Sequence, residues 1–277
     1  MSIHRIVSCL LVICVLGLGA GCGGKSTRLD AAERLPADQL YAAAKRALDR
    51  NQMDRAVKMY QRLVARFPFG AYHEQGQIDL AYALYKTSKE DEATAAVNRF
   101  IKLYPTHPRI DYAYYLRGLI NFNRNSGFLS KYFSKDFTRR DLQFIRQSFQ
   151  DFGELIAKYP DSEYVPDARQ RMIFLRNGLA QGEIMVASYY FRRGAWVAAA
   201  TRAKLVLEAY QEAPQAATAL AILAESYKRL GQQKLGDETT RVLRENYPAH
   251  PYLEGHWPAK QSKWRQLIPF LPAKKPA

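Results

Sequence analysis

Histidines and carboxylates are the residues of this sequence that could ligate a metal, and their spacing argues against a site. His73 and Glu74 could begin a zinc-binding helix, but the second histidine that such a helix needs three residues later is missing. His250, Glu254 and His256 could share a metal, yet the prolines among them make that segment irregular. Neither a phosphate-binding loop nor a nucleophile elbow occurs. We therefore expect no metal, no cofactor and no catalysis.

Cys22 is a residue whose surroundings indicate a specific covalent modification. A basic start and the apolar run of residues 6–18 are typical of a secretory signal, and the run is shorter than the roughly 20 residues that span a bilayer. Small residues lead up to Cys22, as in the lipobox of bacterial lipoproteins. There the thiol receives a diacylglycerol, and the amine released by cleavage is acylated. The pattern predicts a signal peptide over residues 1–21 and both lipids on Cys22.

An ordinary signal peptide followed by a chance cysteine is the alternative, because Gly19 stands where a lipobox usually has a large aliphatic residue. Cysteine usage favours the lipid, since Cys9 and Cys14 leave with the signal and one thiol remains. Several acyl chains hold a protein on a membrane stably. Gly23 follows, where enterobacterial lipoproteins kept in the inner membrane have Asp, and this resemblance predicts the outer membrane.

The net charge is strongly positive. The full chain carries +15, and removal of residues 1–21 takes away one arginine and no acid, which leaves +14. Such a balance suits nucleic acid, anionic lipid headgroups or acidic protein partners. A periplasmic address makes nucleic acid the least expected of the three.

Four phenylalanine–proline or tyrosine–proline pairs punctuate the mature chain before its tail. Proline lacks an amide hydrogen and clashes with the preceding turn, so each pair marks a helix end. The pairs are Phe67-Pro68, Tyr104-Pro105, Tyr159-Pro160 and Tyr247-Pro248.

Small residues recur at fixed distances before three of these prolines. They stand twelve and twenty-four residues earlier, where two antiparallel helices would cross closely. They are Ala56 and Ala44, Ala93 and Ala81, and Gly236 and Ala224. This spacing matches the tetratricopeptide repeat, a helix–turn–helix unit of 34 residues.

Two degenerate units complete the array. One has its second helix before Pro160 and its first near residues 114–118, with an insertion or a lengthened helix pair over about residues 123–146. The other has Ala187 and Ala199 on either side of a turn at residues 193–196. The sequence predicts an all-α, tetratricopeptide-like solenoid of about five helix pairs, an architecture with a concave binding surface.

This organisation divides the chain into five segments. They are the signal peptide (1–21), a lipidated tether (22–36), repeats one to three (37–160), repeats four and five (161–250), and a basic, proline-rich tail (251–277).

Several segments go beyond the generic repeat. They are Arg66-Phe67-Pro68-Phe69-Gly70, Tyr104-Pro105-Thr106-His107-Pro108, Ile110-Asp111-Tyr112, Leu116-Arg117-Gly118-Leu119 and Arg193-Gly194-Ala195-Trp196-Val197-Ala198. Together they resemble the BamD family, lipoproteins of the outer-membrane β-barrel assembly machine, over roughly residues 20–250. The resemblance implies a lipid-anchored scaffold on the periplasmic face of the outer membrane. Its partners would be the barrel-forming subunit, companion lipoproteins and unfolded outer-membrane proteins.

The resemblance also implies an N-terminal pocket for the aromatic-ended signal of a substrate, or for a companion lipoprotein. Aromatic rings supply apolar area, and an arginine can pair with a carboxylate through two hydrogen bonds. The alternative is that most of these rings belong to the core between repeats, above all Phe67. The candidates are Phe67, Phe69, Tyr72, Tyr112, Tyr115 and Arg117.

A second candidate surface lies at the turn of the fourth repeat. The resemblance implies that the C-terminal repeats dock the barrel-forming subunit, and Arg and Trp are enriched among interface hot spots. The candidates are Arg193, Trp196 and Arg202, with a packing role as the alternative for Trp196.

Two other classes of function compete with the scaffold. One is a periplasmic repeat lipoprotein that binds peptidoglycan or incoming DNA, which the positive charge would suit. The other is an enzyme, which would need converging titratable groups in a pocket. A continuous basic stripe on the surface would favour a polyanion, whereas cations scattered among acids would not.

Overall fold

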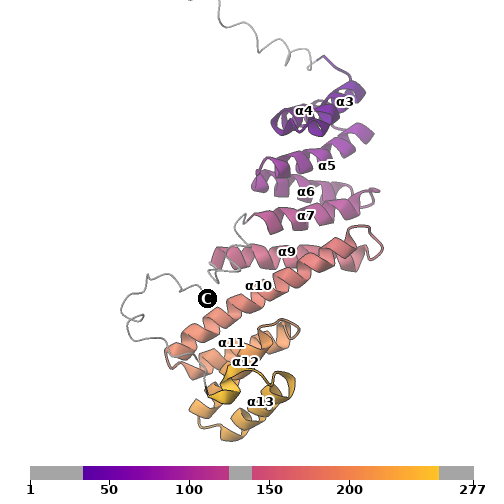
Figure 1. The fold of residues 1–277 in the computed structure, drawn as a ribbon. Coiled ribbons are helices and arrows are strands. Elements are labelled where there is room, and N and C mark those ends of the chain that lie inside the picture. Colours follow the sequence, from indigo (N-terminus) through magenta and orange to yellow (C-terminus); the bar gives the residue numbers. More distant parts are fainter. Residues whose placement is uncertain (1–33, 125–138, 256–277) are drawn as a thin grey trace, which may run out of the picture. The chain divides into compact units, whose positions relative to one another are not determined.

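The computed structural model describes residues 34–124 and 139–255, and every regular element within them is helical (Figure 1). The helices run in pairs: α3 (Ala37–Asp49) with α4 (Met53–Arg66), α5 (Ala71–Lys86) with α6 (Glu90–Leu103), α7 (Ile110–Asn123) with α9 (Arg139–Lys158), α10 (Val165–Arg192) with α11 (Trp196–Ala209), and α12 (Ala216–Arg229) with α13 (Gln233–Asn246). A short 3-10 helix, η2 (Pro251–Glu254), follows. The predicted all-α fold of about five helix pairs is confirmed.

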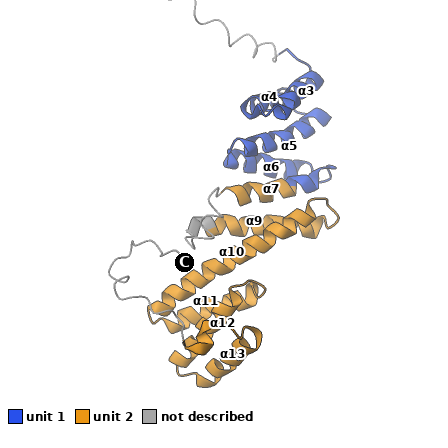
Figure 2. Ribbon diagram, in the orientation of Figure 1, with its two compact units in different colours: residues 1–113 blue, residues 114–277 orange. Residues whose placement is uncertain are grey.

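The helices form two compact units, residues 1–113 and residues 114–277 (Figure 2). The boundary falls inside α7. The first unit therefore holds α3 to α6 and the first turn of α7, and the second holds the rest.

The predicted small residues occupy the positions where paired helices cross. Their side chains have no exposed surface, and they are Ala44, Ala56, Ala81, Ala93, Ala187, Ala199 and Ala224. Gly236 shows why the position must be small, because a Cβ there would lie 2.6 Å from Lys228 Cγ and 3.1 Å from the Ala224 carbonyl oxygen. In the third pair Ser148 takes this place, and its hydroxyl donates to the Gly118 carbonyl over 2.9 Å.

The third and fourth pairs are longer than the standard unit. Residues 125–138 lie outside the described residues, but α9 already begins at Arg139, so the later part of the predicted insertion is a lengthened helix. The α10 helix is 28 residues long, with Pro166 in its first turn, where the missing amide hydrogen costs nothing. The sequence placed the crossing alanine of this helix but did not indicate its length.

The first residues of the predicted tail belong to the fold. In η2, the Tyr252 hydroxyl lies 3.3 Å from Glu225 Oε2, and Tyr252 and Leu253 pack against the core cluster around Leu243. Cys22, the signal peptide, most of the tether and residues 256–277 lie outside the described residues. Among the helices that are described, none is long and apolar enough to cross a membrane.

Candidate functional site

The turn between α4 and α5 presents a highly exposed aromatic ring. Phe67 ends α4, and Pro68 prevents the helix from continuing. Gly70 precedes α5 with a φ of 95°, a left-handed conformation that strains any residue with a side chain. Phe69 lies between these two constraints, and 88% of its surface is exposed. Phe67 is half-buried, so the alternative that these rings belong to the core between repeats fits Phe67 better than it fits Phe69.

His73 holds this turn in place from the first turns of α5. Its Nδ1 lies 2.7 Å from the Phe67 carbonyl oxygen, and its Nε2 lies 2.5 Å from Gln77 Nε2. Because a carbonyl can only accept, Nδ1 carries the proton, and Nε2 accepts from the Gln77 amide. His73 is buried. His73, which the sequence presented as the possible start of a zinc-binding helix, therefore fixes the backbone conformation beside Phe69.

A carboxylate, Asp79, connects three helices of the first unit. The hydroxyl of Tyr41 on α3 donates to Asp79 Oδ2 over 2.9 Å, and that of Tyr60 on α4 lies 3.5 Å from the same atom. Gln75 Nε2 donates to Oδ1 over 3.0 Å. Burial and the neighbouring Asp79 raise the pKa of both tyrosines above the usual value. Both hydroxyls therefore stay protonated and act as donors.

Arg109 joins this hub and remains accessible. Its Nη1 lies 3.3 Å from Asp79 Oδ1, its guanidinium lies 4.8 Å from the centre of the Tyr112 ring, and 41% of its side chain is exposed. Tyr72, which is 45% exposed, places its ring 5.6 Å from that of Tyr41. We call Tyr41, Tyr72, Asp79, Arg109 and Tyr112 the aromatic–arginine cluster.

The cluster contains two of the candidate residues, Tyr72 and Tyr112, together with residues that the sequence reasoning missed. One local signal could have indicated Arg109, because it precedes Tyr112 by three residues, the spacing at which helical side chains meet. No such signal exists for Tyr41, which reaches Asp79 across 38 positions of sequence.

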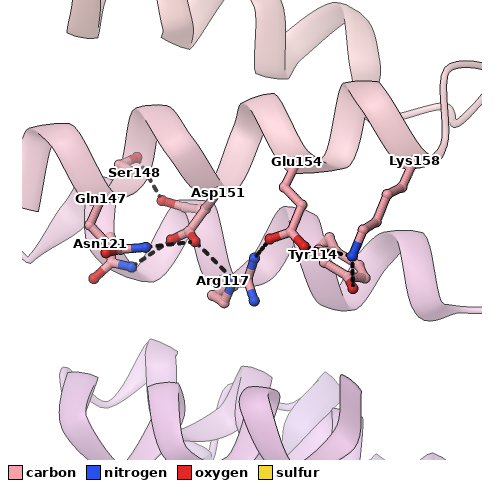
Figure 3. A network of polar contacts seen from close by, with 9 residues as sticks. Tyr114, Arg117, Asn121, Gln147, Ser148, Asp151, Glu154 and Lys158 are labelled. Carbon is pink, nitrogen blue, oxygen red and sulfur yellow. Dashed lines mark hydrogen bonds and ion pairs between the residues drawn. The ribbon is translucent and has the colours of Figure 1, made fainter. Parts of the chain in front are cut away.

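Arg117, the cation chosen from the sequence, has a different environment in the second unit (Figure 3). Its Nε lies 2.9 Å from Asp151 Oδ1, and its guanidinium also forms an ion pair with Glu154. Only 15% of the Arg117 side chain and 2% of the Asp151 side chain are exposed. Asn121 donates to Asp151 Oδ2 over 2.7 Å and Gln147 to Oδ1 over 3.1 Å. A substrate carboxylate would have to displace these contacts.

The charges of this network are set by burial and by neighbouring groups. Burial raises the pKa of Asp151, and Arg117 opposes that rise. Burial would also raise the pKa of Glu154, but hydrogen bonds from Lys158 and Arg117 hold it below the usual value. Lys158 also donates to the Tyr114 hydroxyl over 2.9 Å. Arg117 thus compensates two carboxylates of its own chain.

Tyr115 also makes its contacts within the second unit. Its hydroxyl donates to Asp167 Oδ2 over 2.6 Å, and its ring stacks on that of Tyr164 with centres 4.8 Å apart. Burial and the contact with Asp167 raise the Tyr115 pKa to about 12. The six pocket candidates therefore do not gather in one unit: Phe67, Phe69, Tyr72 and Tyr112 lie in the first, and Tyr115 and Arg117 lie in the second.

The turn of the fourth repeat exposes a mixed surface. Arg193 is exposed, and its guanidinium lies 5.4 Å from the centre of the Tyr189 ring. Val197 is 66% exposed and Tyr189 is 48% exposed. We call Tyr189, Arg193 and Val197 the fourth-repeat surface, of which the sequence reasoning identified only Arg193.

The other two residues proposed for this surface have contacts inside the unit. Trp196 packs edge-to-face against Phe191 with ring centres 5.1 Å apart, and the Arg229 guanidinium lies 5.5 Å from its centre. Arg202 Nη1 lies 3.1 Å from Glu183 Oε2, with 43% of the arginine side chain exposed. Trp196 therefore fits the alternative of a packing role, and the Arg202 side chain is only partly available to a partner protein.

Metal binding finds no support in the described parts of the chain. Residues 34–124 and 139–255 contain no group of three His, Cys, Asp or Glu side chains that could hold an ion. His250 accepts a hydrogen bond from the Tyr252 amide over 3.2 Å, and burial lowers its pKa.

Comparison with known proteins identifies relatives over most of the chain. A family model described as outer membrane lipoprotein (YfiO) matches residues 33–243. The outer membrane protein assembly factor BamD of Xylella fastidiosa strain 9a5c is 41% identical over 267 residues, which cover 96% of this chain and 91% of the relative. BamD of Neisseria meningitidis serogroup B is 42% identical over 227 residues, covering 82% and 85% of the two chains. A solved structure of kinesin light chain TPR-like repeats from Podosopora anserina is 14% identical, with a TM-score of 0.34, and covers 77% of this chain and 94% of that one.

Proposed function

The chain belongs to the BamD family of outer membrane protein assembly factors, and we propose on this basis that it is a lipid-anchored scaffold of the outer-membrane β-barrel assembly machine. In this proposal Cys22 carries the lipid on the periplasmic face of the outer membrane. The helical repeats bind the barrel-forming subunit, companion lipoproteins and unfolded outer-membrane proteins. Family membership over nearly the whole chain is the observation that carries the proposal.

We assign the binding of unfolded substrates to exposed residues of the first unit. An extended chain that ends in an aromatic residue and a carboxylate needs an apolar contact and an accessible cation. The exposed rings of Phe69 and Tyr72 offer the first, and Arg109 offers the second. Arg109 suits the task better than Arg117, because its side chain is more exposed and has one carboxylate partner at 3.3 Å rather than two closer ones.

The fourth-repeat surface is the one that we assign to the barrel-forming subunit. Tyr189 and Val197 give apolar area that is already exposed, so covering it on binding is favourable. Arg193 lies over the Tyr189 ring and can pair with a partner carboxylate at the edge of such a contact.

The scaffold proposal is tested by isolating the lipidated chain from detergent-solubilised outer membrane and identifying what accompanies it. We expect the barrel-forming subunit and companion lipoproteins. Recovery of peptidoglycan fragments or DNA without those proteins would contradict the proposal. In parallel, Cys22→Ser should leave uncleaved or soluble protein in the periplasm, and a variant that is still cleaved and still carries lipid would disprove the anchor at Cys22.

A further inference from the structure

One flank of α13 is uncharged and partly exposed. Its residues are Leu235, Thr239, Val242 and Asn246, which are spaced by four, three and four positions and so form one strip along the helix. At 1.5 Å per residue the strip is about 16 Å long. Leu235 is 44% exposed and Val242 is 39% exposed. We call these four residues the α13 stripe.

The two polar residues of the α13 stripe form hydrogen bonds with their own helix. The Thr239 hydroxyl donates to the Leu235 carbonyl over 2.7 Å, and the Asn246 side-chain amide donates to the Val242 carbonyl over 2.9 Å. Since both side chains already donate to the backbone, the α13 stripe offers a partner mainly apolar surface.

The α13 stripe runs between the packed side of the helix and a charged side. Gly236 and Leu243, its neighbours toward α12, are buried against that helix. Glu238 and Glu245, its neighbours on the other side, are exposed. A segment that covered the α13 stripe would therefore extend the packing between α12 and α13 and would meet carboxylates at its outer edge.

The tail that follows η2 is both basic and apolar. Residues 256–277 contain five Lys or Arg and no Asp or Glu. Covering large apolar side chains is favourable, so the apolar residues of the tail gain free energy from any apolar surface within their reach. We call residues 264–271 the apolar tail segment, because they include Trp264, Leu267, Ile268, Phe270 and Leu271.

The α13 stripe is within reach of this segment. Tyr252 and Leu253 of η2 already hold the chain on the last helix pair, where they pack against the cluster around Leu243. Trp264 follows Gly255 by nine positions, and an extended chain covers up to about 3.6 Å per residue, or roughly 30 Å in all. This distance exceeds the length of the α13 stripe. A segment tethered so closely has a high effective concentration at the stripe.

Charge favours the same contact. Lys263 and Arg265 flank Trp264 at the start of the apolar tail segment, and Glu238 and Glu245 border the α13 stripe. Opposite charges at the edge of an apolar contact add little affinity, but they fix how the two surfaces meet.

We propose that the apolar tail segment folds back onto the α13 stripe, so that the chain covers the exposed flank of its own last repeat. Terminal repeats of helical arrays need their outer apolar surface covered or polar, and the preceding repeats do not supply that cover. The proposal involves neither the lipid anchor nor a partner subunit, so it is independent of the scaffold function.

Trypsin can test the contact on the mature chain, residues 22–277, with Cys22→Ser so that no lipid is attached. Trypsin cuts after Lys and Arg, and mass spectrometry follows each cut. A docked segment protects the bond after Arg265, whereas the bond after Lys274 lies beyond the segment and serves as the reference. We expect Leu235→Ser/Val242→Ser to raise the ratio of the two cleavage rates on the order of tenfold, because cleavage follows the population of undocked tail.

The matched control is Leu103→Ser/Ile173→Ser, which replaces two aliphatic side chains that are 54% and 52% exposed on α6 and α10. It should leave the ratio unchanged, and circular dichroism should show the same helix content in all three proteins. An unchanged ratio in Leu235→Ser/Val242→Ser, or an equal rise in the control, would overturn the proposal.

Two further results would assign the surfaces differently and would also overturn the proposal. Protection of the bond after Arg265 that appears only when phospholipid vesicles are added would place the tail on a membrane. Unchanged cleavage in Leu235→Ser/Val242→Ser, together with lost co-purification of the barrel-forming subunit, would assign the α13 stripe to that partner.

Discussion

Tyr41 and Arg109 bind opposite oxygens of the same carboxylate, 2.9 Å and 3.3 Å from Oδ2 and Oδ1 of Asp79. Asp79 is buried and 41% of the Arg109 side chain is exposed, so the carboxylate orients a cation at the surface without removing it from solvent. The same carboxylate fixes Tyr41, against which Tyr72 packs. One buried acid thus positions the two kinds of group that an aromatic-ended, negatively charged ligand would need.

Replacement of Arg109 should reduce binding of such a ligand without unfolding the protein. We expect Arg109→Ala to weaken a peptide with an aromatic C-terminal residue and a free carboxylate about tenfold, the loss typical of a hydrogen bond to a charged group. The amidated peptide should bind wild type and variant alike. Calorimetric titration measures both peptides. Arg109→Ala also leaves Asp79, whose side chain is 10% exposed, with hydrogen bonds from Tyr41 and Gln75 but without its cation, so the melting temperature should fall, and both titrations are made well below it. An equal loss for both peptides would mean that Arg109 does not contact the carboxylate.

Arg117 should behave in the opposite way, as a residue of the fold. Its removal leaves Asp151, of which 2% of the side chain is exposed, without a compensating cation. We expect Arg117→Gln to lower the free energy of unfolding at neutral pH by about 3 to 5 kcal/mol, measured by denaturant titration. The matched double variant Arg117→Gln/Asp151→Asn should recover much of this loss. No recovery would show that the cost comes from something other than the stranded carboxylate.

The pH dependence of the same variant gives a signed prediction. Burial raises the pKa of Asp151 in the folded state, so folded protein takes up this proton before unfolded protein does as the pH falls. The penalty for the unpaired charge therefore disappears below the raised pKa, and Arg117→Gln should approach wild-type stability in acid. Wild type should itself lose stability there, because the lowered pKa values of Glu154 and Asp167 stabilise the fold only while those groups are ionised. Melting curves over an acidic pH series check both trends.

The repeat register predicts a further pair of outcomes. Ala93 has no exposed surface where α6 crosses α5, so leucine would overpack the crossing and cost about 1 to 3 kcal/mol. Ala95, two residues later on the same helix, is exposed, and Ala95→Leu should be close to neutral. Thermal melts compare the two variants. A neutral Ala93→Leu would show that the crossing can expand, contrary to the tight contact described here.

The repeats were predictable from the sequence because their constraints are local. Proline ends a helix by its own geometry, and a small residue twelve positions earlier marks the crossing in units such as that of Ala93 and Pro105. The candidate site was not predictable in the same way. Asp79 and Arg109 are 30 positions apart, and Arg117 and Glu154 are 37 apart. The sequence alone therefore does not distinguish Arg109 from Arg117. Only the contacts in the folded protein show that Arg109 is accessible and that Arg117 is held by carboxylates of its own chain.

The last prediction concerns the fourth-repeat surface and separates docking from packing. Arg202 is a poor probe, because its removal also leaves Glu183, whose side chain is 12% exposed, without its partner. Val197→Asp is sharper, since Val197 is 66% exposed and the change should cost the fold little. A charge placed in an apolar contact should reduce co-purification of the barrel-forming subunit at least tenfold, whereas Thr201→Asp, at an exposed position one turn further along α11, should reduce it less. Circular dichroism should show unchanged helix content in both variants. If Val197→Asp keeps normal co-purification with a normal fold, the barrel-forming subunit docks elsewhere, and the exposed Tyr189 and Val197 belong to another contact.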